Sequence, residues 1–216
     1  TTRLGQIKRV ERKEFTPGRT YKSKSVKYAK LKDDTDQIVA VAPIKLDDVL
    51  LISQNGYALR FNIEEVPVVG AKAAGVKAMN LKEDDVLQSA FICNTSSFYL
   101  LTQRGSLKRV SIDEIPATSR AKRGLQVLRE LKNKPHRVFL AGAVVEQGFV
   151  SDLFSTEVEE NDQTLLVQSN KGTIYESRLQ DLNLSERTSN GSFISDTISD
   201  EEVFDAYLKE VFTEAK

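Results

Sequence analysis

Lysines and arginines that recur at a fixed distance from glycine are the residues best placed to do chemistry in this sequence. Arg9, Arg60 and Arg109 each stand four residues after a glycine, and Lys8 and Lys108 precede the first and the last. Cations repeated along one edge of an array would contact phosphates, which attract them without regard to base sequence. The alternative is an ordinary solvated surface. We favour the phosphate track because the cations recur at the same repeat position.

Two basic loops extend the predicted track. The segment 19–24 carries three cations, and the segment 120–123 carries three in four residues. Weaker candidates flank the equivalent loop of the second repeat, and another arginine adjoins a turn glycine. The complete set of predicted DNA-contacting residues is Lys8, Arg9, Arg19, Lys22, Lys24, Arg60, Lys72, Lys77, Arg104, Lys108, Arg109, Arg120, Lys122 and Arg123.

Other reactive side chains favour structural roles. His136 is the only histidine, which argues against a histidine metal cluster and a Ser/His triad. Cys93, the only cysteine, follows an apolar run and is expected in the core, and it excludes an internal disulfide framework. Paired acids such as Asp84-Asp85 fall at repeated turn positions. We therefore expect no metal site, no cofactor and no catalytic residue in this chain.

The glycines that precede the cations belong to a longer repeat. Each follows a hydroxyl residue by three positions and precedes an acid by nine, and in three copies a second glycine stands nineteen residues on. The first glycines are Gly5, Gly56, Gly105 and Gly172, the acids are Glu14, Glu65, Glu114 and Asp181, and the second glycines are Gly75, Gly124 and Gly191. A period of about 50 residues is typical of propeller-like arrays.

Each repeat has the pattern of about four short strands joined by Gly, Pro, Asn and Asp turns. One small antiparallel sheet cannot bury both of its faces, so neighbouring sheets must pack together. The sequence therefore predicts an all-β fold, a propeller-like array of about four blades in an open or closed ring. The end of the chain differs, because apolar pairs between 203 and 212 recur at helical spacing and predict a helical tail.

Length and composition fit a single domain over residues 1–216. We expect four repeats at about 1–45, 46–95, 96–145 and 163–216, with an acidic insertion at 146–163. The first residue is not methionine, which suggests a fragment of a longer chain. No apolar run is long enough to span a membrane, and a single cysteine suits a reducing, cytoplasmic compartment.

The net charge of zero conceals an uneven distribution. Lys and Arg outnumber the acids 11 to 2 in residues 1–32 and 10 to 3 in residues 100–140, whereas the acids lead 16 to 5 in residues 141–216. Such an asymmetric field favours a polyanionic partner for one surface of the protein.

These repeats resemble those in the C-terminal domain of the A subunit of bacterial type IIA topoisomerases. The resemblance is carried by the segments 56–61 (Gly-Tyr-Ala-Leu-Arg-Phe) and 105–110 (Gly-Ser-Leu-Lys-Arg-Val), with a glycine nineteen residues on, and it covers nearly the whole chain. It implies a β-pinwheel, a disc whose blades exchange strands and around whose basic rim duplex DNA bends. It also implies that this piece is not an enzyme by itself, because the cleaving tyrosine of the family follows an arginine in another domain, and no Arg-Tyr pair occurs here.

Within this family, the sequence is closer to the topoisomerase IV branch than to gyrase. The first blade of gyrase carries the basic box Gln-Arg-Arg-Gly-Gly-Lys-Gly, where this chain has 21–25 (Tyr-Lys-Ser-Lys-Ser). The resemblance implies a DNA-binding and DNA-bending domain that presents the transported duplex to an ATP-dependent catalytic core and tunes substrate preference in decatenation and relaxation. Its implied partners are duplex DNA and the rest of the A subunit, and through that subunit the B subunit. Its implied location is the cytoplasm, at the nucleoid. A gyrase-like wrapping domain and a protein-interaction propeller remain alternatives.

Overall fold

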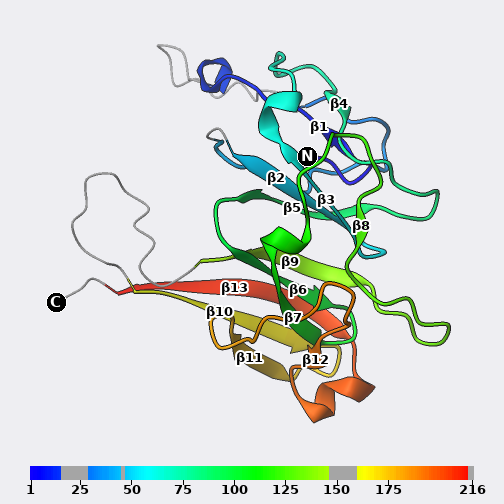
Figure 1. The fold of residues 1–216 in the computed structure, drawn as a ribbon, viewed down its shortest axis with the longest axis vertical. Helices are drawn as coiled ribbons and strands as arrows, with labels where there is room; N and C mark the ends of the chain where they lie inside the picture. Colours follow the sequence, from blue (N-terminus) through cyan, green and yellow to red (C-terminus); the bar gives the residue numbers. More distant parts are fainter. Residues whose placement is uncertain (16–28, 45–46, 146–159, 214–216) are drawn as a thin grey trace.

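The computed structural model describes residues 1–15, 29–44, 47–145 and 160–213. In these ranges the regular structure consists of β-strands and four short 3-10 helices, η1 (Arg12–Phe15), η2 (Ile63–Glu65), η3 (Ile112–Glu114) and η4 (Asp196–Asp200), with no α-helix (Figure 1). The predicted all-β fold is therefore confirmed.

The strands form four sheets that follow one another along the long axis of the molecule (Figure 1). The first sheet pairs β1 (Gln6–Ile7) with β4 (Val76–Lys77). The second has the order β5 (Leu87–Cys93), β2 (Asp48–Ser53), β3 (Tyr57–Asn62), β8 (Leu125–Gln126). The third has the order β9 (Val138–Val144), β6 (Ser97–Thr102), β7 (Ser106–Ser111), β12 (Ser192–Phe193). The fourth has the order β13 (Val203–Thr213), β10 (Glu160–Ser169), β11 (Ile174–Arg178).

The hydroxyl and the first glycine of the repeat build the hairpin turns. Gly56, between β2 and β3, has a φ of 81°, a left-handed conformation that glycine adopts without strain. The Ser53 hydroxyl accepts the N–H of Tyr57 (3.1 Å) and so closes the turn. Thr102 does the same for the N–H of Ser106 (3.1 Å). The repeated hydroxyl is therefore a turn cap.

The second glycine of the repeat allows neighbouring units to exchange strands. Gly124 has a φ of 86°, and a Cβ there would collide with the carbonyl oxygen of Ala58. The two residues after this glycine form β8, which pairs with β3 of the preceding unit. β4 and β12 are donated to β1 and β7 in the same way. Each of the first three sheets is therefore completed by residues of the next unit.

Both faces of the middle sheets are buried, because successive side chains of a strand point to opposite faces and apolar residues occupy both sets of positions. Leu50 and Ile52 of β2 face a core shared with Phe98 and Leu100 of β6. The intervening Val49 and Leu51 face a core shared with Ile7 and Met79. A third core lies between β6 and the fourth sheet, around Tyr99, Leu101, Leu165 and Val167. The sheets are thus the layers of one continuous stack.

The predicted helical tail is wrong, because β13 is a long strand that pairs with β10 from Glu160↔Thr213 to Ser169↔Val203. The repeat position that forms β5 and β9 forms β13 here, so sheet pairing overrides the local apolar spacing. Most of the predicted acidic insertion, residues 146–159, lies outside the described residues. Its last four residues, 160–163, belong to β10.

Candidate nucleic-acid interface

The recurring arginines lie at the junctions between units. Arg9 donates through Nε to the carbonyl oxygen of Val66 in the next unit (2.5 Å). Arg60 donates through Nη1 to the carbonyl oxygen of Ile115 (3.5 Å), and its Nε bonds the Asp48 carboxylate of its own sheet (2.8 Å). The same pattern recurs one unit further on. Arg109 donates through Nη1 to Gln180 O (3.4 Å) and through Nε to Ser97 Oγ (2.8 Å).

Lys108 is a buried cation that joins the third and fourth units. Its Nζ donates to the carbonyl oxygens of Val127 (2.5 Å), Arg187 (2.7 Å) and Ser189 (2.8 Å), and the residue is only 2% exposed. Burial lowers the pKa of Lys108 to about 7, with a further lowering from Arg187 and an opposing contribution from Glu114. An ammonium has three N–H donors, and three carbonyls accept them here.

Lys8 occupies the same repeat position and has the same function at the first junction. Its Nζ donates to the carbonyl oxygens of Ala71 (2.6 Å) and Ala73 (3.0 Å), which correspond in the repeat to those of Arg187 and Ser189. Burial lowers the pKa of the Lys8 ammonium, and Glu14 partly opposes this.

The acid nine residues after each first glycine completes the junction. The carboxylates of Glu14, Glu65 and Glu114 accept the backbone N–H groups of the next unit at Ala71 (2.7 Å), Arg120 (2.8 Å) and Arg187 (2.8 Å), respectively. Asp181 holds this position in the fourth unit, where its described partner is Arg178 of the same unit (3.9 Å). The fixed offsets in the sequence thus encode contacts between units.

These contacts correct the prediction that the recurring cations form a phosphate track. The prediction is wrong for Lys108, because its ammonium is buried and its donors are used within the protein. Lys8, Arg9, Arg60 and Arg109 bind carbonyl groups of the next unit, so we assign them to the junctions instead. We call these five residues the junction cations.

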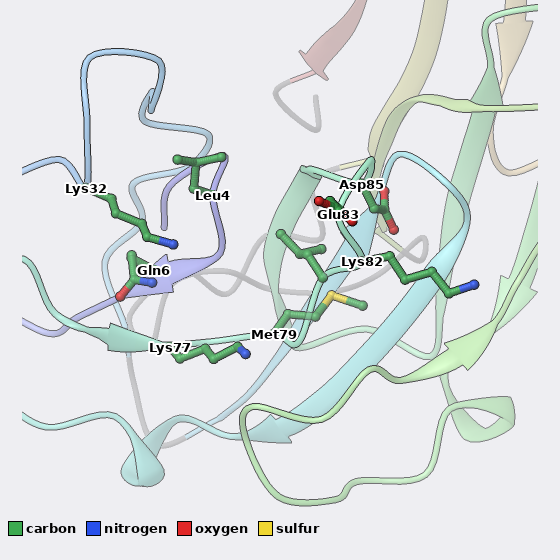
Figure 2. A pocket seen from close by; sticks show the side chains of 9 residues that line it. Leu4, Gln6, Lys32, Lys77, Met79, Lys82, Glu83 and Asp85 are labelled. Carbon is green, nitrogen blue, oxygen red and sulfur yellow. The ribbon is translucent and has the colours of Figure 1, made fainter.

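Other cations collect around two hollows. The first hollow lies between the first and second units and is lined by Lys32, Lys77 and Lys82 together with Glu83, Asp85 and uncharged residues. Figure 2 shows that Lys32 and Lys77 extend into the same space, while Lys82 points away from them. Lys82 also lines the second hollow, so the two hollows share this side chain.

The second hollow lies between the second and third units. Four cations line it, Lys82, Arg123, Arg129 and Arg137. We call these four residues the hollow cations. They come from three separate segments, the turns before β5, β8 and β9. Among the described residues, Glu130 supplies the only carboxylate that lines this hollow. Convergence of cations from distant segments, which was predicted for the repeated pairs, is therefore found at the turns instead.

The predicted residues outside the junctions are distributed as follows. Lys77 and Arg123 line the hollows, Lys72 is exposed, and Lys122 is exposed with its Nζ bonded to the Thr118 hydroxyl (2.7 Å). The guanidinium of Arg120 binds the carbonyl oxygen of Lys77. Arg104 contacts His136 and lies over the Phe193 ring (5.5 Å). The remaining three predicted residues, Arg19, Lys22 and Lys24, lie outside the described residues.

The sequence interpretation missed Lys32, Lys82, Arg129 and Arg137. All four stand near the turn that precedes the last strand of a repeat. They do not share one distance from the first glycine of their repeat, so the repeat pattern does not identify them. The excess of cations over residues 100–140 was the available signal, because it includes Arg129 and Arg137.

Neither a metal cluster nor a membrane helix is found in the described part of the chain. No three His, Cys, Asp or Glu side chains gather there as ligands for an ion. None of the described helices has the length and apolar character to cross a membrane. Cys93 is half-buried against the core, and burial raises the pKa of its thiol to about 12, which makes it a weak nucleophile at neutral pH.

The family model described as DNA gyrase C-terminal domain, beta-propeller, matches residues 1–45, 47–94 and 97–143. The chain is 93% identical over 215 residues to the A subunit of DNA topoisomerase 4 from Streptococcus pneumoniae serotype 4, covering 100% of this chain and 26% of that protein. It is 39% identical over 196 residues to the same subunit of Bacillus subtilis, covering 90% and 22%. The chain thus spans about a quarter of the length of these relatives.

Two solved structures have the same architecture. The C-terminal domain of DNA topoisomerase IV superposes with a TM-score of 0.79 at 34% identity, covering 97% of this chain and 60% of that one. The C-terminal domain of DNA gyrase A gives a TM-score of 0.72 at 22% identity, covering 95% and 63%, a likeness that concerns the fold alone. The predicted propeller-like fold is therefore confirmed.

Proposed function

The chain belongs to the family of DNA gyrase C-terminal domains with a β-propeller fold. From this premise we propose that it is the DNA-binding and DNA-bending domain in the A subunit of a topoisomerase IV. In that role it presents a transported duplex to the catalytic core and tunes the choice between decatenation and supercoil relaxation. Its partners are duplex DNA and the rest of the A subunit, which in turn contacts the ATPase-bearing B subunit. It works at the nucleoid in the cytoplasm and performs no catalytic step itself.

The observation that carries the proposal is that two neighbouring hollows lined by cations share the side chain of Lys82. Lys82 lines both hollows, with Lys32 and Lys77 in the first and with Arg123, Arg129 and Arg137 in the second. These cations come from three successive units of the stack, so a duplex that follows them crosses the junctions between units. Contacts with phosphates along such a path position a duplex without reading its bases.

The extent of the path matters for bending. Bending a duplex of about 20–30 base pairs costs on the order of 1–6 kcal/mol. One phosphate contact does not offset that cost, whereas contacts distributed over three units do so together. Lys72, Lys122 and Arg104 are further candidates for such contacts.

An interaction with another protein is the second candidate function. It is favoured by apolar side chains on the fourth unit, where Ile174, Phe204 and Tyr207 are 61%, 70% and 57% exposed. A wrapping function like that of gyrase is a variant of the first candidate. It predicts chirally wrapped DNA, which ligation of nicked circles in the presence of the protein would detect as a change in linking number.

The proposal is tested by electrophoretic shift of duplex DNA at several salt concentrations. We expect binding that weakens steeply with salt, because phosphate contacts release counterions. Replacing both Lys82→Gln and Arg129→Gln is expected to lower the slope of log K against log salt by about 0.9 per lost contact. Lys209→Gln in β13 is the matched control and keeps the wild-type slope. Duplex that stays unshifted by micromolar protein at low salt would contradict the proposal.

A further inference from the structure

The second hollow has a local excess of positive charge. In the described part of the chain, one carboxylate, that of Glu130, lines this hollow with Lys82, Arg123, Arg129 and Arg137. Among the described residues, none of these four cations forms an ion pair. Within the described residues they differ in this from Arg60, which pairs with Asp48 (2.8 Å).

Two of the hollow arginines are held in place by the protein. The guanidinium of Arg123 lies 4.0 Å from the centroid of the Tyr57 ring, and its Nε is buried without a hydrogen-bond partner in the described residues. Arg137 donates its backbone N–H to Gln103 Oε1 (2.5 Å) and its Nη1 to the carbonyl oxygen of His136 (3.1 Å). Stacking and hydrogen bonding thus limit the freedom that these side chains would lose on binding a ligand.

A histidine stands at the edge of this group of cations. His136 is buried, and its Nδ1 lies 3.1 Å from the Thr102 hydroxyl and its Nε2 3.0 Å from Arg104 Nη1. Burial and the Arg104 charge lower the pKa of His136, which favours the neutral form of the ring. It is the only histidine in the chain, which makes its ring a single spectroscopic reporter of charge in the hollow.

We propose that the second hollow is a seat for one tetrahedral oxyanion, and that a phosphate of the DNA backbone fills it when the domain binds a duplex. Guanidinium groups match phosphate oxygens with paired N–H donors, which explains why arginines dominate this site. The identity of the ligand as a DNA phosphate rests on the proposed function. Inorganic phosphate has the same chemistry, so the seat can be tested apart from DNA.

The test follows the NMR signals of the His136 ring while inorganic phosphate is added at constant ionic strength, with chloride as the balancing anion. The charged groups around the ring are Lys82, Arg104, Arg123, Arg129, Glu130 and Arg137. Phosphate is expected to shift the ring signals saturably and to raise the pKa of His136, because a bound anion favours the imidazolium. Joint replacement Arg123→Gln and Arg137→Gln is expected to weaken this response roughly tenfold or more.

Two variants serve as references. Arg129→Gln removes an exposed arginine from the hollow and keeps the test valid if the double variant fails to fold. Arg178→Gln, on β11 of the fourth sheet, is the matched control and leaves the phosphate response unchanged. A response that the Arg129→Gln variant retains in full, or that chloride alone reproduces, would overturn the seat.

A second arm of the experiment adds a DNA duplex of about 25 base pairs in place of phosphate. This length lies in the range for which the free energy of bending was given above. If the duplex binds in a shift assay while neither phosphate nor duplex moves the His136 signals, the seat is overturned and the proposed function stands. If phosphate moves the signals while the duplex does not bind, the seat stands and the proposed function falls. We expect both phosphate and duplex to move the ring signals in the same direction.

Discussion

The junction cations and the hollow cations are made of the same two residue types, and their surroundings give them opposite roles. Lys108 is 2% exposed and donates hydrogen bonds to three backbone carbonyls, whereas Arg129 is exposed and its side chain lines a hollow with one acid. A repeated backbone presents the same carbonyls at every junction, so cations that serve it recur at fixed offsets. Cations that face a ligand need only to gather in space.

Of the substitutions that test this comparison, Lys108→Leu is expected to have the largest effect on the free energy of unfolding. Leucine is the natural residue at the equivalent position of the second unit, Leu59, where the carbonyl of Lys122 accepts the N–H of Asn80 instead (2.8 Å). In the third unit the change removes the donor that Arg187 O and Ser189 O share. We expect a loss of roughly 3 kcal/mol in the free energy of unfolding, measured by urea denaturation. A loss below about 0.5 kcal/mol would show that the junction does not need the ammonium.

The pH dependence of stability sharpens the same contrast. The pKa of Lys108 is about 7 in the folded protein and near its ordinary 10.5 when unfolded, so between these values the unfolded chain binds more protons. Stability attributable to Lys108 therefore rises with pH from about 7 to 10.5 and is lost again as the pH falls through this range. The difference in free energy of unfolding between wild type and Lys108→Leu is expected to grow in favour of the wild type as the pH rises. A difference that stays constant with pH would contradict a lowered pKa.

Glu65→Ala is expected to have an intermediate effect. The Glu65 carboxylate accepts the N–H of Arg120 across the second junction, and its loss should cost about 1.5 kcal/mol in the free energy of unfolding. Asp181→Ala is the matched control at the same repeat position, where the described partner is the exposed Arg178 of the same unit (3.9 Å). It should cost less than about 0.5 kcal/mol. Equal losses from both variants would mean that the acid acts within its own unit.

The smallest effect on stability is expected from the hollow cations. Lys82→Gln and Arg129→Gln together should change the free energy of unfolding by less than about 0.5 kcal/mol, because both side chains are exposed. The same variant should weaken duplex binding, which Lys108→Leu should leave unchanged under conditions where it is folded. Thermal melts and shift assays on both variants therefore test whether stability and binding reside in separate groups of cations. A destabilised Lys82/Arg129 variant would break the comparison.

The sequence predicts the repeats and the fold well, because each turn requires specific residues. Gly56 needs a positive φ and Gly124 needs the absence of a Cβ, and both requirements are visible as fixed glycines. The direction of a side chain is not visible in this way. Lys108 and Arg129 look equally basic in the sequence, and only the packing of the next unit decides that one is buried and the other exposed. The same limit explains why a strand formed where the apolar spacing of 203–212 predicted a helix.

The exchange of strands between units has a consequence for how the protein forms. β8 lies more than one repeat after β3, to which it hydrogen-bonds, so the second sheet stays unfinished until the third unit has been made. A single repeat therefore has a sheet with an unpaired edge strand, and neighbouring repeats must fold together to pair it. Cutting the polypeptide where one repeat ends would leave one fragment without its outermost strand and give the other a strand with nothing to pair with. The smallest autonomous piece of this protein is larger than the period of its sequence.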